Sequence, residues 1–343
     1  MSYLNSSYLE ILKSGECEML IYTIGNKKID VEEGVSVLDA ALASGLVFEY
    51  SCKNGQCGVC KTTLLKGEVI EIQGQLALTE QDRKERKILT CCCAPVTDIE
   101  IDAADLSALH GIEVKTLPTR VNHIAYLSDN IVEIRLRLPP TANFQFIEGQ
   151  YIDVIWGAVR RSYSIASVSS DKELTLLIKL FENGQMSDYW FNQAKANDLL
   201  RIEGPKGTFF LRDTSKPLIF LATGTGIAPV KSILSKLEND PDYQQSQTIE
   251  VYWGNRSPEE FVWEVSFKKL NIDFHNVLSR PVDSWSGEIG YVQNVALAKR
   301  QDIDDVVVYA CGSNAMIQSA KKRFLESGLL DENFHSDAFV QSF

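Results

Sequence analysis

The sequence predicts a multidomain chain that joins an α+β part, an antiparallel β part and a parallel α/β part. Three observations support this division, and the first is that residues 51–60 hold three closely spaced cysteines. Residues 131–138 alternate apolar and polar side chains with period two, as half-buried antiparallel strands do. Residues 217–229 run from an apolar strand into a glycine-rich turn, which is typical of parallel α/β domains. The length of 343 residues leaves room for two or three domains.

The first part, predicted to cover residues 18–105, begins with a β-hairpin and a short helix. Two β-rich runs, 19–24 and 27–32, flank a Gly-Asn pair that suits a hairpin turn. Ser36 can cap a short helix that ends before Gly45. The remaining predicted elements are a strand and turn at 61–67, a polar helix at 79–87, a strand at 98–102 and a linker at 103–114.

The rest of the chain is predicted to form two further domains, at 115–213 and 215–343. In the first of them, short strands at regular spacing indicate a small antiparallel β-barrel. In the second, strands that end in loops alternate with helical segments, which indicates a Rossmann-like parallel α/β domain whose ligands sit at the carboxyl ends of the strands. The predicted strands are 131–138, 151–156 and 173–180 in the barrel, and 217–222, 249–254, 274–279 and 306–312 in the α/β domain.

A group of cysteines carries the most specific signal in the sequence. Cys52, Cys57 and Cys60 have the C-x4-C-x2-C spacing of plant-type [2Fe–2S] ligands, and such a cluster needs a fourth thiolate. Residues 91–93 are all cysteines, and spacing alone leaves the fourth ligand open among them. A zinc site would add a second C-x2-C pair or histidines, and adjacent cysteines do not suit a disulfide framework. The spacing therefore predicts an iron–sulfur cluster.

Composition and charge narrow the classes of partner and location. The net charge of −12 argues against nucleic acid as a partner. No run of about 20 apolar residues predicts a membrane-spanning helix, and residues 1–10 lack the features of a secretory signal. Because at least four of the eight cysteines are assigned to a labile cluster, we expect a reducing, cytoplasmic location. Residues 1–105 hold 17 acidic and 10 basic residues, so this part either attracts a basic partner surface or has an ordinary solvated acidic face.

Two further stretches have the residue types that nucleotides require. Residues 161–164 read Arg-Ser-Tyr-Ser at the end of a barrel strand. The arginine can bind a pyrophosphate, the tyrosine offers a flat face to a flavin, and a serine can donate to a ring nitrogen, although such a run also occurs on exposed strands without a ligand. Residues 224–229 read Gly-Thr-Gly-Ile-Ala-Pro between a strand and a helix, where a pyrophosphate can approach the backbone and the helix N-terminus. A βα turn without a ligand is the alternative.

Taken together, these motifs resemble the ferredoxin–NADP⁺ reductase superfamily over nearly the whole chain. Residues 51–60 resemble plant-type ferredoxins, in which the fourth ligand follows a hydrophobic pair and a small residue, and this favours Cys91 after Ile-Leu-Thr. The flavin motif is extended by residues 184–187 and 204–209, and the glycine turn by residues 311–316. The resemblance implies a β-grasp ferredoxin domain, an FAD-binding antiparallel β-barrel and a Rossmann-like parallel α/β domain for NAD(P)H.

The resemblance also implies three cofactors, namely a [2Fe–2S] cluster, FAD and NADH, with NADPH as a possible substitute. It assigns the cluster to Cys52, Cys57, Cys60 and Cys91. It assigns FAD to Arg161, Tyr163, Ser164, Gly184, Met186 and Ser187. It assigns the dinucleotide to Gly224, Thr225, Gly226, Ser279, Arg280 and Cys311. It implies catalytic positions beside the reacting rings for Ser164, Cys311 and Phe339.

Two of these implied positions have structural alternatives. In the superfamily a cysteine at the place of Cys311 lies beside the nicotinamide, but a buried structural cysteine is the alternative. An aromatic residue near the C-terminus often covers the flavin, and Phe339 matches that position, with Asp337 two residues earlier. Phe343 could also fold back, and a packed tail that never touches the flavin is the alternative.

The choice of dinucleotide depends on the residues after one strand. NADPH-dependent relatives place a Ser-Arg pair on the 2′-phosphate, and Ser279-Arg280 match it. Pro281 follows directly, however, and Asp283 and Glu288 add negative charge that opposes a phosphate. We therefore predict NADH as the preferred donor, with measurable NADPH activity.

Within the superfamily, the order of the three domains resembles single-chain reductases that deliver electrons to a protein partner. The motifs look most like reductases of 3,6-dideoxysugar biosynthesis, which implies that the electron acceptor is a pyridoxamine-dependent dehydrase. The alternative is the reductase component of a mono- or dioxygenase, which has the same cofactors. A binding module fused to a nucleotide sensor is a third interpretation, but it leaves the flavin motif without a purpose.

Overall fold

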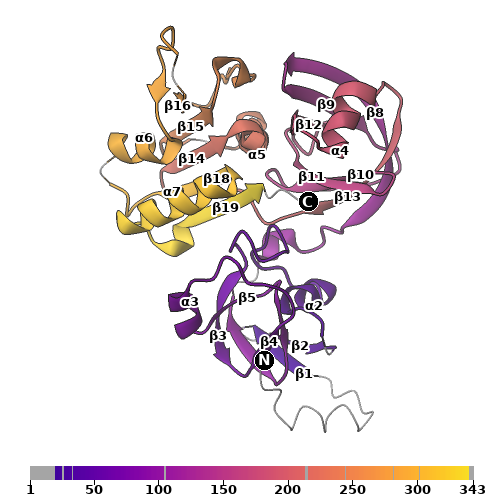
Figure 1. Ribbon diagram of the computed structural model, residues 1–343, viewed down its shortest axis with the longest axis vertical. Coiled ribbons are helices and arrows are strands. Elements are labelled where there is room, and N and C mark those ends of the chain that lie inside the picture. The colour runs from indigo at the N-terminus through magenta and orange to yellow at the C-terminus, as the bar shows by residue number, and fades with distance from the viewer. Residues whose placement is uncertain are drawn as a thin grey trace. The chain divides into compact units, whose positions relative to one another are not determined.

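The computed structural model describes residues 20–24, 27–32, 34–103, 106–212, 215–243, 245–280, 282–300 and 302–339 (Figure 1). These residues belong to two compact units, Met1–His110 and Gly111–Phe343, which are taken separately below. Three predictions fall outside the described residues, namely those on the Gly-Asn turn, Pro281 and Phe343.

The N-terminal unit is a mixed sheet with the order β2-β1-β7-β3-β5, packed against helix α2. β1 and β7 run parallel and the other neighbours run antiparallel. The predicted hairpin, capped helix and closing strand are all present, and the Ser36 side chain accepts a hydrogen bond from the Asp39 N–H at the start of α2. The elements are β1 (Leu20–Ile24), β2 (Lys27–Val31), α2 (Val37–Ala43), β3 (Lys61–Lys66), β4 (Val69–Glu71), α3 (Glu80–Lys84), β5 (Lys87–Leu89), β6 (Cys93–Pro95), β7 (Ile99–Asp102) and the 3-10 turn η1 (Ser107–Leu109).

Two predictions for this unit need correction. The polar helix expected at 79–87 ends at Lys84, because Arg86 takes a left-handed backbone conformation (φ 57°) and its guanidinium binds the carbonyls of Leu64 and Gly67. The chain then enters β5, which pairs with β3. The supposed linker at 103–114 is partly packed, since Leu106 is buried and its N–H donates to Val47 O at 2.7 Å.

The second unit begins with a six-stranded antiparallel sheet of the order β11-β10-β13-β8-β9-β12. The two outer strands approach each other, since Ile165, directly after β11, forms an antiparallel bridge with Leu176 of β12. We call this partly closed sheet the half-barrel, and the prediction of a small antiparallel barrel is confirmed in that form. Its core is lined by alternate residues of the strands, which explains the period-two pattern. The elements are β8 (Lys115–Ser128), β9 (Ile131–Arg137), β10 (Tyr151–Trp156), β11 (Val159–Ser164), β12 (Glu173–Lys179), α4 (Gln185–Asp188), the π-helical turn η2 (Tyr189–Gln193) and β13 (Leu199–Lys206).

The same unit continues into a parallel sheet of the order β17-β16-β15-β14-β18-β19, as the α/β pattern predicted. From β14 the sheet grows in both directions, with β15 on one side and β18 on the other. Ligands usually bind at the carboxyl ends of the strands where the direction of growth changes in this way. The elements are β14 (Leu218–Thr223), the 3-10 turn η3 (Gly224–Gly226), α5 (Ile227–Asn239), β15 (Ile249–Asn255), η4 (Pro258–Glu260), β16 (Ile272–Leu278), β17 (Glu288–Ile289), α6 (Val292–Lys299), β18 (Val307–Ser313), α7 (Asn314–Glu326), η5 (Asp331–Asn333) and β19 (Phe334–Phe339).

The half-barrel and the parallel sheet share one hydrophobic core. Leu177 and Phe209 of the half-barrel pack in the same cluster as Phe220 and Tyr309 of the parallel sheet. Polar contacts cross the same boundary, and Ser232 of α5 donates to the Ser167 carbonyl at 2.6 Å. Because of this shared core, the carboxyl ends of the parallel strands are held against the half-barrel (Figure 1).

The buried carboxylate of Asp82 generates a prediction about stability. Burial alone would raise the pKa of Asp82, but hydrogen bonds from Thr79 and Lys61 outweigh burial and lower the pKa to about 2. A lowered pKa stabilises the fold above the unfolded value of 3.8, and this contribution is lost as the pH falls toward about 2. Asp82→Asn should therefore lower the free energy of unfolding by about 2 kcal/mol near neutral pH.

Chemical unfolding followed by circular dichroism at several pH values checks this expectation. The difference between Asp82→Asn and the original protein should be constant above about pH 5 and should shrink in acid. Glu80→Gln is the matched control, because Glu80 is exposed on the same helix. Equal stability of the two variants would contradict the role given to the Asp82 carboxylate.

Candidate functional site

The four cysteines assigned to the cluster form two pairs in the N-terminal unit. The Cys57 N–H lies 3.4 Å from Cys52 Sγ, and the Cys60 and Cys91 Sγ atoms are 3.4 Å apart. A hydrogen bond from the Cys57 thiol lowers the pKa of Cys52 to about 6, and the same bond raises the pKa of Cys57. Three of the thiols are at most 6% exposed, whereas Cys52 is only partly buried.

This pairing fits a two-iron cluster better than a single metal ion. Among the described residues, no three His, Cys, Asp or Glu side chains converge as the ligands of one ion. A [2Fe–2S] cluster is held by four thiolates, two on each iron, so two separate pairs are the arrangement that it requires. The donors present are thus compatible with the predicted cluster.

The cysteine loop is shaped by glycines that have no room for a side chain. Gly55 and Gly58 both have φ 76°, where only glycine is free of strain. A Cβ on Gly55 would lie 2.1 Å from the Gly74 carbonyl oxygen and 2.9 Å from Cys92 Sγ. The loop therefore packs at Gly55 directly against Gly74 and Cys92, and this close contact restricts the positions of the loop cysteines.

The three adjacent cysteines have different partners. Cys91 Sγ lies 3.4 Å from both Cys60 Sγ and Cys92 Sγ, and Cys92 Sγ is also 3.4 Å from Gln73 Nε2 and 3.8 Å from the Gly74 carbonyl oxygen. Cys93 opens β6, opposite Glu71 of β4, and burial raises the pKa of its thiol to about 12. Of the three, Cys91 is the one that completes a pair with a cysteine of the loop.

The predicted flavin motif ends β11 at Ser164, a buried residue whose hydroxyl has no hydrogen-bond partner within the described part of the chain. A buried, unpaired hydroxyl is unfavourable unless a ligand satisfies it, so Ser164 Oγ suits a flavin ring nitrogen. Tyr163 is half-buried at the edge of the half-barrel core. Of the two adjacent arginines, Arg160 pairs with Asp153 and Glu203, whereas Arg161 makes no ion pair among the described residues.

The second half of the flavin motif forms the short helix α4. Gly184 precedes its first residue, and Met186 is buried in the half-barrel core. The Ser187 hydroxyl accepts a hydrogen bond from the Phe181 N–H at 3.0 Å and so fixes the loop that leads into the helix. The Ser187 hydroxyl is thus already hydrogen-bonded within the chain. The first N–H groups of α4, in contrast, have no acceptor within the helix, as at any helix start.

The glycine turn and the predicted nicotinamide cysteine are in contact. A Cβ on Gly226 would lie 2.4 Å from the Cys311 carbonyl oxygen, and a Cβ on Gly312 would lie 2.2 Å from Thr223 Oγ1. Gly224 has φ 57°. The ends of β14 and β18 can therefore approach each other this closely only if glycine occupies both positions. Without side chains there, the backbone of the turn is not covered at the strand ends.

The Cys311 side chain is fully buried rather than open to solvent. Burial and the Asp337 carboxylate on the neighbouring strand raise the pKa of this thiol well above its usual value, so it is a neutral thiol. Phe339 ends β19 opposite Ser313 and is 36% exposed. A tail residue at that strand end can cover a ring bound at the same edge.

The structure adds two residues that sequence reasoning missed. Lys179 ends β12, and its side chain is the nearest group to a Cβ placed on Gly224, at 3.9 Å. Its ammonium lies 2.6 Å from the carboxylate of Glu260, which is 5% exposed and also accepts from Asn130 Nδ2 at 2.8 Å. A cation thus stands beside the glycine turn. No spacing rule links residues so far apart in the sequence.

The predicted dinucleotide pair, Ser279 and Arg280, follows directly after β16. The Ser279 hydroxyl donates to the Asn255 carbonyl at 3.1 Å, so it is already engaged. Arg280 is exposed, and no ion pair is seen for it in the described ranges. Glu288 pairs with Lys299 at 2.7 Å, so its charge opposes a nearby phosphate less than the sequence suggested.

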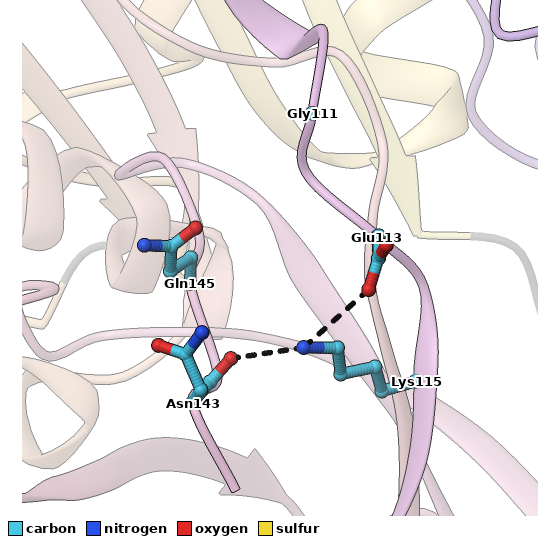
Figure 2. Close-up of a pocket in the computed structure, with 5 residues that line it drawn as sticks. All are labelled: Gly111, Glu113, Lys115, Asn143 and Gln145. Carbon is cyan, nitrogen blue, oxygen red and sulfur yellow. Dashed lines mark hydrogen bonds and ion pairs between the residues drawn. The ribbon is translucent and has the colours of Figure 1, made fainter.

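The second unit also has a polar pocket. It is lined by Gly111, Glu113, Lys115, Asn143 and Gln145 (Figure 2). The Lys115 ammonium donates to the Asn143 carbonyl at 3.1 Å and pairs with Glu113 at 3.5 Å. No predicted site residue lines this pocket, and its lysine already has partners, so it is not the nucleotide site.

Three family models match successive parts of the chain. Residues 23–96 match a 2Fe-2S iron-sulfur cluster binding domain. Residues 118–211 match an oxidoreductase FAD-binding domain, and residues 220–322 match an oxidoreductase NAD-binding domain.

Curated relatives match over nearly their whole length. The chain is 42% identical to the CDP-6-deoxy-L-threo-D-glycero-4-hexulose-3-dehydrase reductase of Yersinia pestis, over 92% of this chain and 96% of the relative. It is 39% identical to protein RfbI of Salmonella typhimurium, over 92% and 95%. It is 32% identical to the terephthalate 1,2-dioxygenase reductase component 1 of a Comamonas species, over 90% and 93%.

Solved structures share the fold. The Amycolatopsis cytochrome P450 reductase GcoB has a TM-score of 0.72 at 24% identity, covering 94% of this chain and 99% of its own. A ferredoxin reductase of carbazole 1,9a-dioxygenase has a TM-score of 0.66 at 24% identity, with the same coverage. In the described part of the chain, none of the helices has the length and apolar character that crossing a membrane requires.

The thiol pairs generate a prediction about the cluster. Cys91→Ser should abolish the visible absorption and the iron content of the cluster, because its thiol is the one that pairs with Cys60. Cys92→Ser and Cys93→Ser should keep both. Iron analysis and the absorption spectrum of the purified variants check this, and loss of the cluster in the Cys93 variant alone would show that the ligand lies two residues further on.

Proposed function

The chain belongs to the iron–sulfur flavoprotein reductases, which join a [2Fe–2S] domain to FAD- and NAD-binding oxidoreductase domains, and from this premise we propose that its electron acceptor is the dehydrase that acts on a CDP-6-deoxyhexulose. The observation that carries the proposal is the 42% identity to a reductase of that dehydrase over 92% of the chain. The relative that serves a dioxygenase is 32% identical.

The domain matches confirm the predicted cofactor classes and the assignment to the oxidoreductases. When bound, the flavin and the cluster together supply the conversion of the two electrons of a hydride into single electrons. We assign the cluster to Cys52, Cys57, Cys60 and Cys91, since these thiols form two pairs.

At the flavin, the proposed roles follow from burial and hydrogen bonding. The unpaired Ser164 hydroxyl would donate to the ring, and Tyr163 would pack along it. The guanidinium of Arg161 donates one hydrogen bond to the Arg160 carbonyl at 2.7 Å but forms no ion pair among the described residues, so it would be the arginine that binds a pyrophosphate. The start of α4, with Gly184, Met186 and Ser187, would offer N–H groups to the same pyrophosphate.

At the dinucleotide, the bare backbone of Gly224, Thr225 and Gly226 would admit the pyrophosphate. Lys179 stands beside this turn, and the buried Glu260 carboxylate would hold its ammonium until a phosphate competes for it. Cys311 would form a neutral wall of the nicotinamide site, since a buried thiol with a raised pKa is a poor nucleophile.

An assay of electron transfer tests the proposed acceptor. The holoenzyme with NADH should reduce the purified dehydrase, together with its hexulose substrate, faster than it reduces the oxygenase component of a terephthalate dioxygenase. The opposite order would favour the second candidate function, a reductase component of an oxygenase, which the Comamonas relative supports. Bleaching of the flavin and cluster absorption by NADH is the control for an active enzyme.

The exposed Arg280 generates a prediction about the dinucleotide. We propose NADH as the preferred donor, with NADPH used more slowly. Arg280→Ala should lower kcat/KM for NADPH by about tenfold, because a charge-assisted hydrogen bond to the 2′-phosphate is lost. The value for NADH should change little, and steady-state kinetics with both donors measures it. An equal loss for both donors would place Arg280 elsewhere in the site.

The position of Phe339 at the end of β19 generates a second prediction. If this ring covers the flavin, Phe339→Ala should change the rate of flavin reduction by NADH by about tenfold, because the stacking of the two rings is altered. The cluster spectrum should stay the same. Stopped-flow absorption measures the rate, and Leu330→Ala is the control because Leu330 is another exposed apolar residue, 55% accessible. An unchanged rate would make Phe339 a packing residue.

A further inference from the structure

An apolar surface borders the cysteine loop of the N-terminal unit. Ile70, Ile72 and Leu76 are 36%, 43% and 75% exposed, and we call these three residues the apolar rim. The other large exposed aliphatic residue described in this unit is Leu65, at the far end of β3 from the cysteines. Exposure of large apolar side chains in one short segment is unusual for a surface that stays in water.

Backbone contacts tie the rim to the cysteine loop. The Ile72 N–H donates to the Cys92 carbonyl at 2.9 Å, next to the thiol pair of Cys91 and Cys60. The Ala77 N–H donates to the Gly55 carbonyl at 2.9 Å, directly after Leu76. The rim therefore lies along the loop that carries Cys52, the least buried of the four assigned cysteines.

Two ion pairs lie near the rim. Lys53 binds Asp39 at 3.1 Å on one side, and its ammonium also lies 5.1 Å from the Tyr50 ring centroid. Arg83 binds Glu71 at 3.4 Å on the other side. Neither of these pairs adds net charge to the rim.

We propose that the apolar rim is the docking surface for the electron-accepting protein, and that this partner meets it with an uncharged, apolar surface around its own redox group. The proposal rests on the proposed function, which requires a protein acceptor for electrons from the cluster. Electron transfer becomes slow with distance, so the acceptor has to approach the cluster at the exposed side of its loop. The core of a protein–protein interface is depleted of charge and rich in apolar side chains, as the rim is.

The test compares rim variants of the full-length holoenzyme. Leu76→Ser should raise the KM for the purified dehydrase about tenfold, because a central apolar anchor is lost. Ile72→Thr should act in the same direction and serves as the second variant. Leu65→Ser, equally apolar but distant from the cysteines, should have no effect on this KM. An unchanged cluster spectrum confirms that each variant is folded.

Three further measurements show whether the rim acts in docking alone. NADH-dependent reduction of ferricyanide and the stopped-flow rate from flavin to cluster should both be unchanged in Leu76→Ser, because neither step involves the partner protein. Raising the salt from about 50 to about 200 mM should slow dehydrase reduction by less than about threefold, because charge pairs do not carry the docking.

The contrary outcomes are equally clear. An unchanged KM in both rim variants would overturn the proposal, and so would a steep salt dependence. Slower transfer from flavin to cluster would mean that the rim serves the flavin-bearing unit of the same chain. If the original protein does not reduce the dehydrase at all, the proposed acceptor is wrong. In that case the KM values of the same variants are compared with an oxygenase component that the protein does reduce, and this comparison shows whether the rim is a docking surface.

Discussion

The approach of Cys91 to Cys60 is the constraint on which the N-terminal unit depends. The two sulfur atoms come from positions 31 residues apart, and the pairing of β3 with β5 brings them to 3.4 Å. Lys61, the residue after Cys60, is tied to Asp82 of α3, so the helix that precedes β5 is fixed to the strand that follows the cysteine loop. The cluster site is thus a consequence of strand register, and a shift of one residue would turn the thiols apart.

A similar constraint operates in the second unit, with backbone atoms in place of sulfur. The ends of β14 and β18 meet at Gly226 and Gly312, where a Cβ would collide with the opposite chain. In both units, two backbone segments approach closely at the candidate site, at the cysteine loop in the first unit and at the glycine turn in the second. The side chains with proposed chemical roles surround these two places. Lys179 and Glu260 reach the second of these places from separate elements, and Lys179 brings the end of a half-barrel strand beside the glycine turn.

Local patterns predicted the fold well because each of them reports a local cause. The period-two run at 131–138 became β9, and the glycine turn after β14 fell where the strand pattern placed it. The failures have non-local causes. The helix at 79–87 was predicted too long because Arg86 binds carbonyls in a distant strand, and the pairing of Lys179 with Glu260 spans 81 residues. Likewise, sequence could not tell that Arg160 forms ion pairs while Arg161 forms none among the described residues, since Asp153 and Glu203 come from other strands.

The core shared by the half-barrel and the parallel sheet has a consequence for how such chains can be recombined. Leu177 and Phe209 have their packing partners in the α/β portion, so either portion alone would expose an apolar face. A chimera that exchanges only the flavin portion or only the nicotinamide portion would have to rebuild that face. The segment Gly111–Phe343 is therefore the natural block for exchange between relatives, and Met1–His110 forms a separate module that can be replaced without cutting through a core.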